Sequence, residues 1–293
     1  MQKIIPHLWF DKEAVEAAKF YTSIFQNSKI NSITKIRDTP SGDCDFVVFD
    51  LSGFKFMALS GGPLFKFNPS ISILVFYDTK EEVDQMHSKL SKGGKDLMPL
   101  DSYPFSDRYA WVQDKYGLSW QLMFSSEPIK QKITPFLMFT QERSGKSEEA
   151  INFYASVFHN SKIGDIMRFE AGEEPNQPGT IKFAQFTLED QNFAAMDGGR
   201  VHDFTFNEAV SLLVDCDTQE EIDYYWSKLS ADPESEQCGW LKDKYGVSWQ
   251  INPKLVGEML QDKDLEKVKR VTQALLKMKK FDIAELKKAY EEK

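Results

Sequence analysis

The side chains that could act as nucleophiles or metal ligands are few and scattered in this sequence. The histidines are His7, His87, His159 and His202, and the cysteines are Cys44, Cys216 and Cys238. Zinc sites and disulfide frameworks show closely paired cysteines, whereas this set is odd in number and has no Cys-x-x-Cys spacing. We therefore expect reduced thiols. A reactive thiol needs a lowered pKa, and no histidine lies near Cys238 in sequence, so we expect that thiol to be inert.

Small polar residues form a second kind of candidate site. Two segments carry small residues at alternate positions: Asn68, Ser70 and Ser72 in one, and Asn207, Ala209 and Ser211 in the other. Alternate residues of a β-strand share one face, so we expect each set to lie opposite a mostly apolar face that meets helices. Two interpretations stay open. The polar groups either bond to each other and to the backbone, or they contact a ligand.

These segments belong to an internal repeat that spans most of the chain. Residues 27–30 (Asn-Ser-Lys-Ile) recur at 160–163, and residues 114–117 (Asp-Lys-Tyr-Gly) recur at 243–246. Residues 119–121 (Ser-Trp-Gln) likewise recur at 248–250. The offset of roughly 130 residues is far longer than a solenoid repeat and fits a duplicated domain. We predict one domain over residues 1–126, a second over 131–254, and a helical tail over 255–293.

Each copy is predicted to contain the order βαβββ twice. A strand over 4–10 precedes a helix over 12–25 with one apolar face, and three strands follow near 30–36, 45–51 and 54–59. A strand over 70–77 then leads to the capping box Thr79-x-x-Glu82, whose counterpart is Thr218-x-x-Glu221. Closing strands lie over 109–112 and 118–124. In the tail, an apolar stripe is expected to pack on its own domain: Leu265, Val268, Val271, Leu275 and Met278.

Composition restricts the classes of partner. The 293 residues include 36 Lys and Arg and 45 Asp and Glu, which gives a formal net charge of −9. An acidic surface disfavours nucleic acid and anionic membranes, because phosphate binding needs clustered basic residues. No apolar stretch reaches the roughly 20 residues that span a bilayer, and the N-terminus does not resemble a signal peptide. We expect a cytoplasmic protein that binds neither nucleic acid nor membrane.

Several of these motifs together resemble a known family. They are Pro6 and Phe10 in the first strand, Phe20-Tyr21 in the helix, the closing Asp-Lys-Tyr-Gly-x-Ser-Trp-Gln, and residues 238–243 and 278–283. The chain resembles the PhnB-like branch of the glyoxalase/bleomycin-resistance/dioxygenase (vicinal oxygen chelate) superfamily, to which the name 3-demethylubiquinone-9 3-methyltransferase is attached. The resemblance implies an α+β fold of two tandem glyoxalase-like domains, each with two βαβββ modules in a curved mixed sheet around a cup. It also implies that the fused copies form an internal pseudo-dimer.

Enzymes of this superfamily hold a metal in the cup, and the resemblance allows the ligand positions to be checked. The last-strand Glu of the family corresponds to Gln121 and Gln250 here. The first-strand His corresponds to Pro6; His7 lies one residue away and is expected to point to the other face. Copy two has Phe136 in place of His7. We therefore expect no metal and no cofactor, with His7 as a weak candidate metal ligand.

The function predicted from these features is binding of a small, partly apolar ligand in a cup of neutral polar and aromatic residues. The candidate lining residues are Asn68, Ser72, Gln121, Asn207, Ser211, Gln250 and Trp240. No catalytic residue is assigned. The alternatives are a metal-dependent lyase or dioxygenase of this superfamily, and a structural or partner-binding protein. Methyltransferase activity is not favoured, because the sequence lacks a Gly-rich loop between a strand and a helix.

Overall fold

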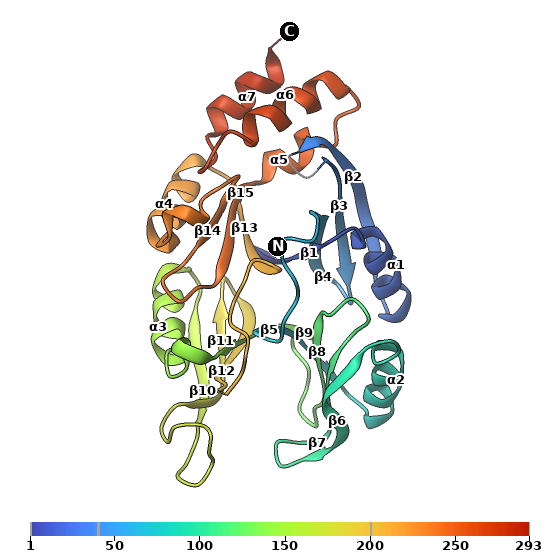
Figure 1. Cartoon of the computed structure of the whole chain (residues 1–293), viewed down its shortest axis with the longest axis vertical. Helices are drawn as coiled ribbons and strands as arrows, with labels where there is room; N and C mark the ends of the chain where they lie inside the picture. The colour runs from blue at the N-terminus through green and yellow to red at the C-terminus, as the bar shows by residue number, and fades with distance from the viewer. Residues whose placement is uncertain (1, 40–41, 200, 293) are drawn as a thin grey trace. The chain divides into compact units, whose positions relative to one another are not determined.

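The computed structural model describes residues 2–39, 42–199 and 201–292. The chain divides into two compact units. One consists of the described parts of residues 1–22, 28–65 and 207–293, and the other of the described parts of 23–27 and 66–206. Each unit contains one mixed sheet with helices packed on its outer face (Figure 1).

The first unit contains a seven-stranded sheet in the order β14-β15-β13-β1-β4-β3-β2. Its strands are β1 (Ile4–Phe10), β2 (Lys29–Thr39), β3 (Gly42–Leu51), β4 (Phe54–Ser60), β13 (Val210–Cys216), β14 (Trp240–Lys242) and β15 (Ser248–Pro253). Strand β1 pairs antiparallel with β13 and parallel with β4. Helices α1 (Ala14–Ile24) and α4 (Gln219–Leu229) cover the outer face.

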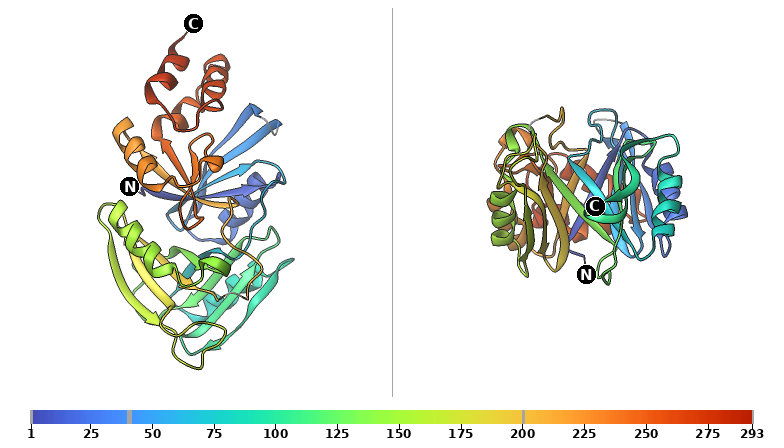
Figure 2. Two further views of the ribbon diagram at one scale, coloured as in Figure 1. Left: turned by 60° about the vertical axis from the view of Figure 1, so that its left-hand side comes forward. Right: turned by 90° about the horizontal axis from the view of Figure 1, so that it is seen from below.

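The second unit contains an eight-stranded sheet in the order β10-β11-β12-β9-β5-β8-β7-β6. Its strands are β5 (Ile71–Tyr77), β6 (Lys95–Tyr103), β7 (Ser106–Gln113), β8 (Ser119–Phe124), β9 (Ile133–Phe139), β10 (Lys162–Arg168), β11 (Ile181–Leu188) and β12 (Gln191–Asp197). Helices α2 (Lys80–Leu90) and α3 (Ser147–Val157) pack on it, and a short 3-10 turn, η1 (Gln141–Arg143), precedes α3. Figure 2 gives two further views of the same elements.

Each sheet combines one module from each sequence repeat. Strands β1–β4 of the first repeat join β13–β15 of the second, while β5–β8 join β9–β12. The repeats therefore define the modules, and the sheets form by pairing the first module of one copy with the second module of the other. The predicted α+β class, with two modules in each mixed sheet, is confirmed.

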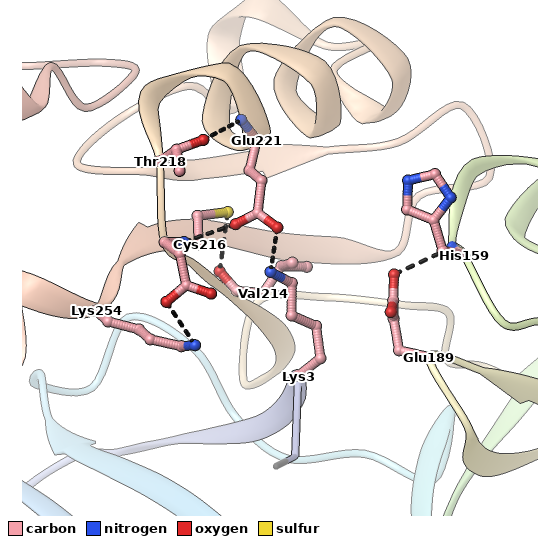
Figure 3. Close-up of polar contacts among 9 residues, drawn as sticks. Lys3, His159, Glu189, Val214, Cys216, Thr218, Glu221 and Lys254 are labelled. Atoms are coloured by element: carbon pink, nitrogen blue, oxygen red, sulfur yellow. Dashed lines mark hydrogen bonds and ion pairs between the residues drawn. The ribbon is translucent and has the colours of Figure 1, made fainter.

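The predicted capping boxes begin α2 and α4. Thr79 Oγ1 accepts a hydrogen bond from Glu82 N (3.2 Å), and Thr218 Oγ1 accepts one from Glu221 N (3.3 Å). Glu221 also accepts a bond from Lys3 Nζ (2.8 Å), which ties the start of β1 to α4 (Figure 3). Burial raises the pKa of the neighbouring Cys216 thiol to about 12, which agrees with an inert thiol.

The recurring Asp-Lys-Tyr-Gly-x-Ser-Trp motif forms a closed turn before the last strand. Oδ1 of the buried Asp243 accepts bonds from Tyr245 N (2.8 Å) and Val247 N (3.0 Å), and its Oδ2 accepts one from Trp249 Nε1 (2.8 Å). Gly246 adopts a φ of 87°, which favours glycine. The first repeat has the same bonds around Asp114. This motif therefore has a structural role, which explains why both copies contain it.

The last module differs from its counterpart in one strand. A short 3-10 turn, η2 (Pro233–Ser235), replaces the strand that corresponds to β6. The backbone N–H groups of Cys238 and Gly239 instead donate to Met278 O (2.8 Å) and Lys279 O (2.7 Å). The C-terminal tail thus satisfies the edge groups that β6 satisfies in the other sheet.

The tail packs on its own unit, as predicted. Its helices are α5 (Lys254–Met259), α6 (Leu265–Leu275) and α7 (Ile283–Glu291). They form a buried cluster that consists of Val256, Met259, Val271, Leu275, Phe281 and Leu286. The prediction was wrong for one residue of the stripe: Leu265, at the first position of α6, is exposed. None of the helices in the described ranges is both long and apolar enough to cross a membrane.

Candidate functional site

Four of the singled-out residues meet on the inner face of the seven-stranded sheet, opposite the helices. The β1–β13 register places His7 beside Ser211, and the β13–β15 register places Leu213 beside Gln250. Trp240 in β14 also lies beside Gln250. Because paired residues share a face of a sheet, we call His7, Ser211, Gln250 and Trp240 the His7 cluster.

The contacts within the His7 cluster are both polar and aromatic. Gln250 Nε2 donates to Ser211 Oγ at 2.9 Å. The His7 ring meets the Trp240 ring edge to face, with centroids 5.5 Å apart, and stacks on Phe46 at 6.0 Å. Trp9 contacts Trp240 at 6.0 Å, while its indole N–H donates to Gly62 O. The imidazole therefore lies within an aromatic wall whose half-buried members are Phe46, Trp9 and Trp240.

His7 itself is buried, with 2% of its surface exposed, and its Nδ1 has no hydrogen-bond partner in the described part of the chain. Desolvation by burial lowers the pKa of His7 to about 3, so the imidazole is neutral at pH 7. Protonating it costs about 5 kcal/mol more than protonating an exposed histidine. A neutral imidazole with an unused nitrogen can form one hydrogen bond with a bound molecule.

This burial predicts a pH-dependent stability. Between the unfolded pKa of 6.5 and the folded pKa of about 3, the unfolded chain binds more protons, so stability falls as pH falls through that window. Relative to His7→Phe, the wild type should lose about 2 kcal/mol of unfolding free energy between pH 7 and pH 5. Urea unfolding at both pH values measures this change, and His159→Phe, at an exposed position, is the matched control. If the difference in unfolding free energy between wild type and His7→Phe were the same at pH 7 and pH 5, this prediction would be contradicted.

Two further polar residues follow on the same face. Asp215 in β13 lies beside Asn252 in β15. Desolvation raises the pKa of Asp215, and the nearby Lys55 opposes that rise. The buried Oδ1 of Asn252 also has no hydrogen-bond partner within the described residues. The inner face of this sheet therefore carries two buried polar atoms, His7 Nδ1 and Asn252 Oδ1, without a hydrogen-bond partner among the described residues.

The eight-stranded sheet differs at the corresponding positions. Its register places Phe136 beside Ser72 and Phe76 beside Met123, where the other sheet has His7 beside Ser211 and Asp215 beside Asn252. Leu74, Phe136, Met138 and Ala194 form a buried cluster there, and six partly buried hydrophobic residues pack against it: Phe76, Trp111, Met123, Phe183, Met196 and Phe204. This face is predominantly apolar.

The polar groups on that second face bond to one another. Ser72 Oγ lies 2.9 Å from Ser119 Oγ, which also accepts a bond from Trp111 Nε1 at 2.7 Å. Tyr109 OH donates to Gln121 Oε1 at 2.9 Å. In the module of β5, β7 and β8, the small polar residues therefore bond to each other, as the first of the two interpretations proposed.

The structure places the remaining predicted lining residues at the starts of strands. Asn68 Oδ1 accepts a bond from Ser70 N (2.8 Å), and its Nδ2 donates to Thr205 O (2.9 Å). Asn207 Oδ1 accepts a bond from Ala209 N (2.9 Å). These are local turns that lead into β5 and β13. Their contact with a ligand stays a prediction.

The expectation that His7 points away from the cup was wrong, because the register places His7 rather than Pro6 beside Ser211. Pro6 instead lies beside Leu212, on the helix-covered face. Sequence reasoning also missed Asp215 and Asn252. Continuing the period-two alternation from Ser211 and from Gln250 would have identified both.

A catalytic metal of the superfamily type does not fit these residues. Such a metal needs several nitrogen or oxygen ligands that converge, with charged ligands to balance it. The His7 cluster offers one imidazole, one hydroxyl and one neutral amide. Across residues 2–39, 42–199 and 201–292, no three His, Cys, Asp or Glu side chains are grouped so as to hold a metal ion.

Comparison with known proteins identifies the two repeats. A family model described as 3-demethylubiquinone-9 3-methyltransferase matches residues 2–123 and 131–252. A Bacillus cereus protein described as a 3-demethylubiquinone-9 3-methyltransferase, PhnB protein, is 40% identical to this chain; the match covers 42% of this chain and 100% of that chain, with a TM-score of 0.40. The resemblance to the PhnB-like family is thereby confirmed. No curated protein matches the chain.

More distant structures match over both repeats. Glyoxalase I from Zea mays is 13% identical with a TM-score of 0.52, over 85% of this chain and 92% of that chain. A Bacillus subtilis protein described as a dioxygenase is 10% identical with a TM-score of 0.52, over 84% of each chain. At these identities the likeness concerns the fold alone.

Proposed function

Because the chain belongs to the 3-demethylubiquinone-9 3-methyltransferase family as two tandem copies, we propose that it binds a small, partly apolar ligand on the inner face of the seven-stranded sheet. The observation that carries this proposal is the buried, neutral His7, which lies among aromatic rings and whose Nδ1 has no hydrogen-bond partner within residues 2–39, 42–199 and 201–292. A buried polar atom without a partner costs about 1–3 kcal/mol, and a ligand that bonds to it recovers part of that free energy. The proposed binding uses no catalytic metal.

The difference between the two sheets supports a single polar site. At equivalent positions the seven-stranded sheet presents His7, Asp215 and Asn252, whereas the eight-stranded sheet presents Phe136, Phe76 and Met123. We propose that the first sheet binds the ligand and that the second has a supporting role. We also propose that the tandem copies act as an internal pseudo-dimer, since each sheet combines strands from both repeats.

The test is a thermal-shift screen of small aromatic and dicarbonyl compounds, followed by calorimetry on the compounds that stabilise the protein. Binding to His7→Phe, which introduces the residue of the other sheet, should weaken about tenfold or more. His159→Phe, at an exposed position, should bind as the wild type does. Unchanged affinity in His7→Phe would refute this location for the site.

Elemental analysis of the purified protein separates this proposal from its main alternative. A stoichiometric, tightly held divalent metal would favour a metal-dependent lyase or dioxygenase. No bound compound across the screen, together with no metal, would instead favour a structural or partner-binding role.

A further inference from the structure

We infer that His7 determines the specificity of this site by selecting an uncharged ligand that presents a hydroxyl group to Nδ1. The inference rests on the proposed function and adds the chemical class of the ligand. It starts from the polar atoms that surround His7. Ser211 and Gln250 bond to each other, and the Trp9 indole bonds to Gly62 O, so each of these groups already has a partner. His7 Nδ1 has none in the described part of the chain.

The hydrogen-bonding properties of imidazole restrict the group that can meet Nδ1. In one neutral tautomer Nδ1 accepts a hydrogen bond, and in the other it donates one. A hydroxyl serves both tautomers, because it donates and accepts. A carbonyl oxygen serves only the tautomer with a proton on Nδ1. A single hydroxyl oxygen therefore fits this position in either state, whereas an amide must present a different atom to each tautomer.

Charge excludes the other common ligand groups. A carboxylate next to His7 would lose its hydration at this buried position and would gain only one N–H of a neutral imidazole as a partner there. An ammonium group could donate to Nδ1 in only one tautomer, and cation–π contacts with Phe46, Trp9 and Trp240 would replace only part of the hydration that it loses. Lys242, two residues from Trp240, and Glu208, three residues from Ser211, already pair with each other at 2.8 Å.

The aromatic wall determines the rest of the ligand. Phe46 stacks near-parallel to the imidazole, with an interplanar angle of 28°, while Trp240 meets it at 89°. Flat apolar groups pack favourably against ring faces and edges in both arrangements. We therefore expect the site to accept a compact apolar body with one hydroxyl, of the alcohol or phenol type.

Three probes of similar size test the inference: phenol, toluene and benzoate. In wild-type protein, phenol should bind about tenfold or more tightly than toluene or benzoate, because only phenol satisfies Nδ1 without charge. In His7→Phe the preference for phenol over toluene should disappear while toluene still binds. Toluene that binds wild type as well as phenol does would overturn the inference but leave the proposed function intact. If none of the probes binds wild type, both fail.

A measurement on the unaltered protein guards against a variant that does not fold. With nitrogen-15-labelled histidine, phenol should shift the His7 Nδ1 resonance, and toluene at equal saturation should shift it much less. Equal shifts with both probes, or no shift with bound phenol, would overturn the inference.

Discussion

Replacing Asp243 with alanine should lower the free energy of unfolding by about 4 kcal/mol, because the change leaves several buried donors without a partner. The carboxylate accepts bonds from Tyr245 N, Val247 N and Trp249 Nε1, all at 3.0 Å or less. Bonds to a charged acceptor are stronger than neutral ones, and Trp249 is fully buried, so water cannot replace the lost oxygen at its indole. Urea unfolding measures the loss.

The control is Asp11→Ala, which removes an exposed carboxylate from the same unit and should change stability by less than about 0.5 kcal/mol. Asp243→Asn keeps one oxygen acceptor and should fall between wild type and Asp243→Ala. Asp114→Ala in the other repeat removes an equivalent set of bonds and should show a loss of similar size. If Asp243→Ala were as stable as Asp11→Ala, the claim that the repeated motif stabilises the fold would be refuted.

The Gly239→Ala substitution should destabilise the protein by about 3 kcal/mol, because a strained backbone and a steric clash add together. Gly239 has a φ of 81°, and an added Cβ would lie 2.5 Å from Phe281 Cε2 and 2.6 Å from Asn252 Oδ1. Phe281 belongs to the buried tail cluster, so the change should also loosen the tail. Thermal unfolding and the rate of proteolysis within residues 277–280 measure the two effects.

Gly53→Ala separates the two causes. Gly53 has a φ of 80°, almost the same as Gly239, but no atom lies within 4 Å of an added Cβ. We expect this control to lose only the backbone part, about 1 kcal/mol, and to keep the tail protected. Equal losses in both variants would show that the tail does not pack against Gly239.

Local sequence patterns predicted most elements of this fold. The expectation of three strands after α4 was wrong, because η2 replaces the first of them and the C-terminal tail pairs with that edge instead. The helical period of 12–25, the capping boxes at Thr79 and Thr218 and the turn at 243–246 depend on residues close in sequence, and all were observed. The exchange of modules could not be predicted. Strand β1 pairs with β13 rather than with β5. Because β5 and β13 occupy the same place in the two repeats, either pairing would bury similar apolar residues.

The candidate site could be predicted only where it depends on the pattern within one strand. Ser211 and Gln250 were expected on one face, and they do bond there, because alternation within a strand fixes the face. The position of His7 depends on the register of β1 against β13, which are about two hundred residues apart, and a register shift of one residue reverses every side chain. The tail contact at Cys238 likewise depends on long-range pairing and gave no local signal.

The location of the ligand is the central claim, and methionine methyl resonances report on it directly in the unaltered protein. Met57 lies beside His7 in the seven-stranded sheet, whereas Met138 and Met196 belong to the apolar inner face of the eight-stranded sheet. Titrating carbon-13 methyl-labelled protein with a compound that binds should shift the Met57 resonance and leave those of Met138 and Met196 in place. Shifts at Met138 and Met196 with an unmoved Met57 would contradict the account.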